Sequence, residues 1–269
     1  MSTHIHIDRQ AELATFEELV VGSCNENILL IQAPPGRGKT WLVTEYQKLA
    51  RQRGLPCAVV DLRWSETGVS DVMATLGEEW GWEHFEGFRA SVAGAGRAAV
   101  QVDLRGILQI GRPQIQVVLA AESEHERRER RRLLTDALMA DVRGWLSHPT
   151  RRAVLIVDTY NPAGTPKTVG PELQEWLEAV LLPHARRTPG LVMVVAGQQI
   201  PTASAAWENC CRRLELGPLS NPDDWMEFVQ RLGAQVSREI VAAYCHSCQG
   251  EPLTIATHLS MLRTFGGGG

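Results

Sequence analysis

Residues 33–40 have the sequence Ala-Pro-Pro-Gly-Arg-Gly-Lys-Thr. They follow a short apolar run at residues 28–31 and precede an amphipathic segment at residues 40–53. A glycine-rich loop between a buried strand and a helix is the setting in which backbone N–H groups surround phosphate oxygens. The stretch therefore predicts a phosphate-binding loop, with Ala33 at a position where glycine is usual.

The loop residues divide the work of holding a nucleoside triphosphate. Gly36 and Gly38 would let successive N–H groups turn inward, Lys39 would contact the β- and γ-phosphates, and the Thr40 hydroxyl would ligate Mg²⁺. The chain has only three lysines, and one of them is Lys39. A compact ammonium is thus kept where a point charge must fit inside a ring of backbone groups. The predicted nucleotide-binding residues of this segment are Ala33, Pro34, Pro35, Gly36, Arg37, Gly38, Lys39, Thr40 and Trp41.

A carboxylate is expected at the end of a neighbouring strand. Asp158 directly follows the apolar run at residues 154–157 and could hold Mg²⁺ through water. We therefore predict Lys39 and Asp158 as the catalytic residues and Thr40 and Asp158 as the metal site. The Asn-Lys-x-Asp segment expected for guanine recognition does not occur in the sequence, so ATP or ADP is the predicted nucleotide.

Composition limits the class of protein. With 27 basic and 31 acidic residues the net charge is −4, so the sequence lacks the excess of basic residues typical of a nucleic-acid binder. No apolar stretch approaches the roughly 20 residues of a membrane helix, and the polar N-terminus has no signal-peptide pattern, so we expect a cytoplasmic protein. The six scattered cysteines are expected to be free thiols.

Strand and helix patterns alternate along most of the chain. Apolar runs predict strands, and segments with helical spacing between them predict helices that cover both faces of a parallel sheet. The predicted fold is a three-layer α/β P-loop NTPase with a five-stranded parallel sheet. The predicted strands are residues 28–31, 57–62, 153–158, 191–197 and 212–216, and the predicted helices include 10–20, 40–53 and 171–182.

Two regions depart from this alternation. Residues 98–119 alternate apolar and polar side chains and predict a β-ribbon, within an insertion at about 87–132. The charged run 122–132 within it predicts the solvated start of a helix. Residues 222–265 contain three helical patterns and no strand, which predicts a small helical lid. The expected organisation is a core at 1–219, a lid at 220–265, and a glycine linker or the end of an expressed fragment at 266–269.

With these motifs in place, the chain resembles the STAND class of P-loop ATPases, relatives of the NACHT and NB-ARC switch domains and of AAA+ proteins. Arg9-Gln-Ala-Glu-Leu13 resembles the N-terminal Arg-x-x-Glu-Leu motif of the class, and Val194-Val-Ala-Gly197 resembles its sensor strand. Leu214-Glu-Leu-Gly-Pro-Leu219 resembles its exit strand, and Gly250-Glu-Pro252-Leu253 resembles its Gly-x-Pro motif. The resemblance spans roughly residues 5–265 and implies that Arg9 lies near adenine and that Pro252 packs against the base.

The resemblance implies an ATP/ADP-controlled regulatory switch in signal transduction, with self-association or an effector domain as partner. Two departures predict weak or absent hydrolysis. Thr159-Tyr160-Asn161 offers no carboxylate after Asp158, and Gln198-Gln199 stands where relatives commonly place an arginine. An active AAA+-type ATPase and a nucleotide-stabilised interaction scaffold remain the alternatives. The resemblance and the preference for arginine over lysine also suggest a bacterial defence protein.

Overall fold

The computed structural model describes residues 9–63, 67–100, 112–120, 123–161 and 169–265. Five strands form one parallel sheet in the order β2-β3-β4-β1-β5, which confirms the predicted five-stranded parallel sheet. The strands are β1 (Ile28–Gln32), β2 (Cys57–Asp61), β3 (Ala153–Tyr160), β4 (Leu191–Gly197) and β5 (Cys211–Glu215).

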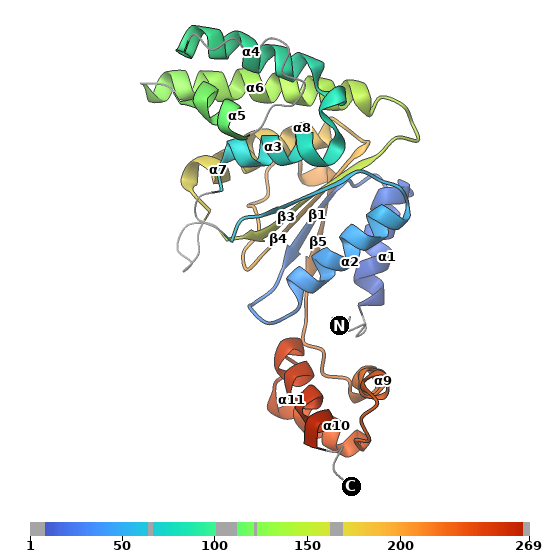
Figure 1. Cartoon of the computed structure of the whole chain (residues 1–269). Coiled ribbons are helices and arrows are strands. Elements are labelled where there is room, and N and C mark those ends of the chain that lie inside the picture. Colours follow the sequence, from blue (N-terminus) through green and yellow to red (C-terminus); the bar gives the residue numbers. More distant parts are fainter. Residues whose placement is uncertain (1–8, 64–66, 101–111, 121–122, 162–168, 266–269) are drawn as a thin grey trace.

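Helices cover both faces of the sheet (Figure 1). One face packs against α1 (Gln10–Val21) and α2 (Lys39–Gln52). The other packs against α3 (Val69–Trp80), α7 (Pro171–Trp176), a π-helical turn (Leu177–Leu181) and α8 (Leu182–Arg186). Successive residues of a strand point to opposite faces, so Leu30 joins one core and Leu29 the other. Burial on both faces explains why the central strands β1, β3 and β4 are mostly apolar runs in the sequence, whereas the edge strand β5 contains charged residues and is partly exposed.

The predicted β-ribbon is wrong. The structure has helices there instead, α4 (Glu86–Val100) and α5 (Arg112–Leu119), which pack with α6 (Glu124–Trp145) into an outer layer. Ile115 and Val118 are fully buried while Gln116 is exposed, so the apolar spacing follows the helical period. Short apolar runs fit either period, and packing decides between them. Residues 101–111, which carried part of the ribbon pattern, lie outside the described residues.

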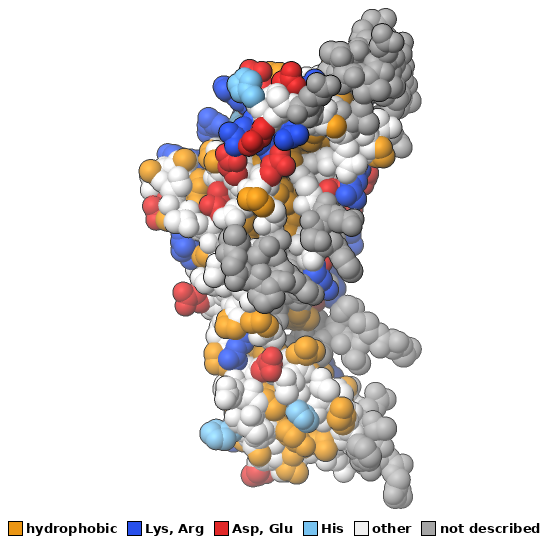
Figure 2. Space-filling view, turned by 90° about the vertical axis from the view of Figure 1, so that its left-hand side faces the viewer, with side chains coloured by type: hydrophobic (Ala, Val, Ile, Leu, Met, Phe, Trp, Pro, Cys, Tyr) orange, Lys and Arg blue, Asp and Glu red, His pale blue; other side chains and the backbone are white. Residues whose placement is uncertain are grey.

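The charged start of α6 is solvated, as predicted. Residues 123–129 are exposed, and Figure 2 shows side chains of both signs gathered over this end of the outer layer. Farther along the helix, Leu134, Leu138 and Val142 are buried. Along the part of the chain that the structure describes, no helix is both long and apolar enough to cross a membrane.

Three helices follow β5 and share a hydrophobic core of their own, α9 (Pro222–Leu232), α10 (Arg238–Ser247) and α11 (Pro252–Phe265). We call them the helical lid; Figure 1 shows it beyond the end of the sheet. Both backbone polar groups of Leu219 are hydrogen-bonded to the lid. Its N–H donates to the Gly250 carbonyl at 2.9 Å, and its carbonyl accepts from Trp225 Nε1 at 2.8 Å.

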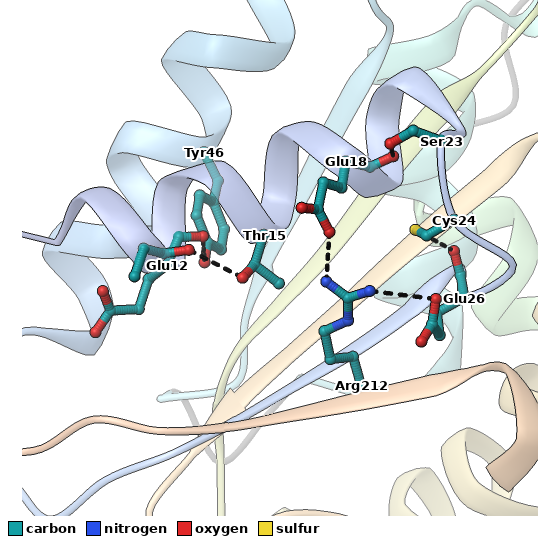
Figure 3. Close-up of polar contacts among 9 residues, drawn as sticks. Glu12, Thr15, Glu18, Ser23, Cys24, Glu26, Tyr46 and Arg212 are labelled. Atoms are coloured by element: carbon teal, nitrogen blue, oxygen red, sulfur yellow. Dashed lines mark hydrogen bonds and ion pairs between the residues drawn. The ribbon is translucent and has the colours of Figure 1, made fainter.

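Polar contacts at both ends of α1 hold it in place (Figure 3). Arg212 of β5 reaches Glu18 of α1 at 2.6 Å and Glu26, just before β1, at 3.4 Å. Tyr46 of α2 donates to the Glu12 carbonyl at 2.9 Å. These contacts hold α1 beside α2, and Arg9, which precedes α1, is thereby placed next to the phosphate loop.

Candidate nucleotide-binding site

The loop between β1 and α2 has the backbone conformation that a phosphate cradle requires. Gly36 and Gly38 have φ angles of 79° and 88°, a left-handed conformation that is strained for residues with a side chain. Gly38 is the N-cap of α2 and has no side chain to accept from the first N–H groups of the helix. These N–H groups and the positive end of the helix dipole favour an anion at this point.

Lys39 lies folded back on the loop. Its Nζ donates to the carbonyls of Ala33 at 2.6 Å and Pro34 at 2.8 Å. Burial lowers the pKa of Lys39, and the nearby Asp158 carboxylate opposes this shift. The ammonium must exchange these neutral acceptors for phosphate oxygens to act on a nucleotide.

Thr40 and Asp158 meet at the carboxyl end of β3. Asp158 is 3 % exposed, and it accepts hydrogen bonds from the Thr40 hydroxyl and, at 2.8 Å, from the Thr159 N–H. Burial raises the pKa of Asp158, and these two hydrogen bonds oppose the shift. A hydroxyl and a carboxylate are hard oxygen donors that suit Mg²⁺, which takes few ligands from the protein and the rest from phosphates and water. No group of three or more His, Cys, Asp or Glu side chains with metal-binding geometry occurs among the described residues.

One cation of the site, Arg63, was not singled out from the sequence. Asp61 pairs in register with Asp158, and Arg63 follows two residues later and lines the same cavity. The Arg63 guanidinium lies 3.3 Å from the Asp61 carboxylate. Charged residues that follow parallel strands meet at one edge of the sheet, and this rule could have identified Arg63.

Asn161 and Gln198 close the site at the ends of β3 and β4. Asn161 is 2 % exposed, and its side-chain oxygen accepts from the Gln198 N–H at 3.0 Å. Gln32 Nε2 donates to the Gln198 carbonyl at 3.2 Å. Asp158 is the sole carboxylate among the described residues that line the cavity. Two nearby carboxylates, Glu251 against Gly36 and Asp61 beside Arg63, are not among its lining residues.

These side chains border a cavity of about 980 Å³, which is large enough for a nucleotide. Its walls include Arg9 and the lid residues Pro252 and Leu253. Ala33 and Pro34 are not among the described lining residues; they contribute the carbonyls that hold Lys39. The predicted residues that do line it are Pro35, Gly36, Arg37, Gly38, Lys39, Thr40, Trp41, Asp158, Arg9 and Pro252.

The lid touches the phosphate loop directly. Arg37 Nη1 donates to the Gln249 carbonyl at 2.9 Å. The Glu251 carboxylate lies against Gly36, since a Cβ added to this glycine would be 1.9 Å from Glu251 Oε1. Arg9 joins the loop to the segment that follows β5, because its Nη2 donates to the carbonyls of Gly217 at 2.8 Å and Arg37 at 3.3 Å.

Comparison with known proteins bears on the fold. No protein-family model and no curated protein matches the sequence. The structure is similar to the Walker-type ATPase PABY2304 of Pyrococcus abyssi, with a TM-score of 0.55 and 15 % identity over 97 % of this chain and 68 % of that one. It also matches PCH-2 of C. elegans, with a TM-score of 0.46 and 11 % identity over 95 % of this chain and 63 % of that one. The sheet, the loop and the first similarity together show that the chain has the fold of a P-loop NTPase.

Proposed function

We propose that this chain is an ATP- or ADP-binding regulatory switch domain of a signal-transduction ATPase, with weak or no hydrolysis of its own. The observation that carries the proposal is the contact between the helical lid and the phosphate loop, made by Glu251 against Gly36 and by Gln249 with Arg37. A lid that rests on the residues that bind phosphate responds directly to what the loop holds.

Charge determines how the contact between the lid and the phosphate loop responds to a nucleotide. The N-terminus of α2 and Lys39 favour a negative group, and the Glu251 carboxylate supplies one from the lid. Nucleotide phosphates bring further negative charge to the same loop and repel Glu251. A nucleotide therefore favours arrangements in which Glu251 has moved, and γ-phosphate adds to this bias.

Each residue of the site has a defined task in the proposal. Lys39 would contact the phosphates, and Thr40 and Asp158 would hold Mg²⁺, which neutralises phosphate charge when bound. Arg63 would place a second positive charge beside the phosphate end. Pro252 and Leu253 would form an apolar wall for the base opposite Arg9.

Weak hydrolysis is expected because the residues at the end of β3 offer no free carboxylate to activate water. Asp158 is engaged by the Thr40 hydroxyl, and Asn161, an amide, cannot take a proton from water. The alternatives, an active AAA+-type ATPase and a nucleotide-stabilised scaffold, differ from the switch in turnover and in their response to the nucleotide.

The proposal is tested by comparing the protein with ATP·Mg²⁺ and with ADP. We expect nucleotide binding that Lys39→Ala removes, slow turnover, and hydrogen exchange of residues 249–253 that differs between the two nucleotides. Sedimentation velocity would show whether self-association follows the nucleotide. Turnover comparable to active ATPases that disappears in Lys39→Ala would favour the AAA+ alternative. Tight binding with identical exchange and assembly in both nucleotides would favour the scaffold.

A further inference from the structure

A second hollow, of about 240 Å³, lies at the opposite end of the sheet from the phosphate loop. It is bordered by the turn between α6 and β3 and by the turn between α8 and β4; in Figure 1 the first of these lies on the far side of β3 from the lid. Among the described residues no aspartate or glutamate lines it. The basic residues that line it are Arg143, His148, Arg151, Arg152 and Arg187.

Neutral acceptors of the protein hold these four arginines. Arg143 Nη1 and Arg187 Nη2 lie 3.1 and 3.4 Å from His184 Nδ1, so the two guanidinium groups are neighbours. Arg151 donates to the Trp145 carbonyl at 2.9 Å, and Arg152 to the Pro189 carbonyl at 3.2 Å. A guanidinium has five N–H donors, so each arginine keeps donors beyond the contact that positions it.

The His184 imidazole between Arg143 and Arg187 is uncharged. Arginine is always a donor, so His184 Nδ1 must be the acceptor and the ring is neutral. Burial lowers the pKa of His184, and the two guanidinium groups lower it further. Asp136 lies 3.5 Å from His184 Nε2, on the other nitrogen of the ring.

Helix ends offset only part of the positive charge. α6 and α8 both end at this hollow, and a helix C-terminus carries roughly half a negative charge. Four arginines therefore leave a surplus of positive charge, in a chain whose net charge is −4. Such a hollow attracts an anion, and guanidinium groups match the paired oxygens of phosphate and carboxylate.

The size and lining define the ligand further. The hollow is smaller than the roughly 300–1,000 Å³ typical of cofactor sites. No Phe, Tyr or Trp side chain lines it among the described residues. We propose that this hollow is a second binding site, which takes a small multivalent oxyanion of the phosphate or pyrophosphate type. The anion would bridge two turns, one of them leading into β3, the strand that carries Asp158.

Pyrophosphate, titrated calorimetrically in Mg²⁺-free buffer, tests the site. Lys39→Ala removes the ammonium of the phosphate loop, so this variant weakens anion binding there and leaves the second site intact. We expect it to bind one pyrophosphate, and Arg151→Gln with Arg187→Gln in the same background to weaken binding at least tenfold. Arg186→Gln is the matched control, because Arg186 donates to the carbonyls of Ala205 and Ala206 and does not line the hollow.

Three results would overturn the proposal. They are no pyrophosphate binding by folded Lys39→Ala protein, an equal loss in Arg186→Gln, or tenfold tighter, arginine-dependent binding of a single-stranded oligonucleotide, which would assign the hollow to nucleic acid. Failure of wild-type protein to bind ATP would count against the proposed switch and leave this test unaffected, because the second site uses none of the phosphate-loop residues.

Discussion

Replacing Glu251 by Gln removes one negative charge from the contact between the lid and the phosphate loop. Glutamine keeps the shape of the side chain and the oxygen that accepts from the Thr254 hydroxyl at 2.6 Å, so the lid should fold normally. The variant therefore isolates the repulsion between Glu251 and the phosphates of a bound nucleotide. We expect it to bind ATP more tightly than the wild type.

The size of the effect follows from Coulomb's law. Two unit charges about 4 Å apart interact by about 1 kcal/mol in water and about 4 kcal/mol near a protein surface. Glu251 is partly exposed, and the lid can move away, so the low end of this range applies. A gain of about 1.4 kcal/mol corresponds to about tenfold tighter ATP binding, with a smaller gain for ADP because it carries less charge.

A fluorescent ATP analogue titrated into each variant measures the affinity. Glu251→Asp keeps the charge, and we expect it to stay within about threefold of the wild type. Glu227→Gln removes the same charge from α9, where Glu227 pairs with Arg231 and does not line the cavity. Unchanged or weaker ATP binding by Glu251→Gln, or an equal gain in Glu227→Gln, would refute the repulsion between the lid and the phosphates.

Four further changes have defined outcomes. Asp158→Asn should weaken Mg²⁺-dependent ATP binding at least tenfold and raise the Tm of the nucleotide-free protein at neutral pH, because the folded state raises the pKa of this carboxyl and its charged form is disfavoured there; a lower Tm would contradict this. Arg63→Ala should weaken ATP more than ADP in equilibrium titrations, whereas equal losses would place Arg63 away from the γ-phosphate. Burial lowers the pKa of His184 in the folded state, so on acidification the unfolded chain is protonated first. The free energy of unfolding should therefore fall as pH drops below about 6.5. In chemical unfolding measured over a pH series, His184→Gln should make this dependence on pH weaker. Phe88→Ala should cost about 3–5 kcal/mol of unfolding free energy, because Phe88 is fully buried and stacks on Trp82, and a loss below about 1 kcal/mol would contradict the packing of α4.

Local sequence was sufficient for the sheet and the phosphate loop. The strand before Ala33 and the glycines at 36 and 38 are signals within a few residues of one another, and β3 and β4 are largely apolar runs. The ribbon prediction failed because the alternation around Ile115 also fits a helix, and only packing against α3, α4 and α6 decides between them.

Long-range contacts account for what the sequence did not provide. Glu251 lies within the predicted Gly-x-Pro motif, but nothing near it in the sequence indicates that its carboxylate rests on Gly36. The basic hollow needed two turns that are brought together by neighbouring strands. Such sites depend on strand order, which local patterns do not contain.

The double fastening of Leu219 to the lid restricts where the chain can bend. Because both its N–H and its carbonyl are bonded to lid residues, Leu219 must travel with the lid as one rigid arm. On the sheet side of Pro218, the Gly217 carbonyl accepts a hydrogen bond from Arg9, which also donates to the Arg37 carbonyl. Bending is thus confined to the peptide units around Pro218. A small rotation there would produce a larger displacement at the far end of the lid.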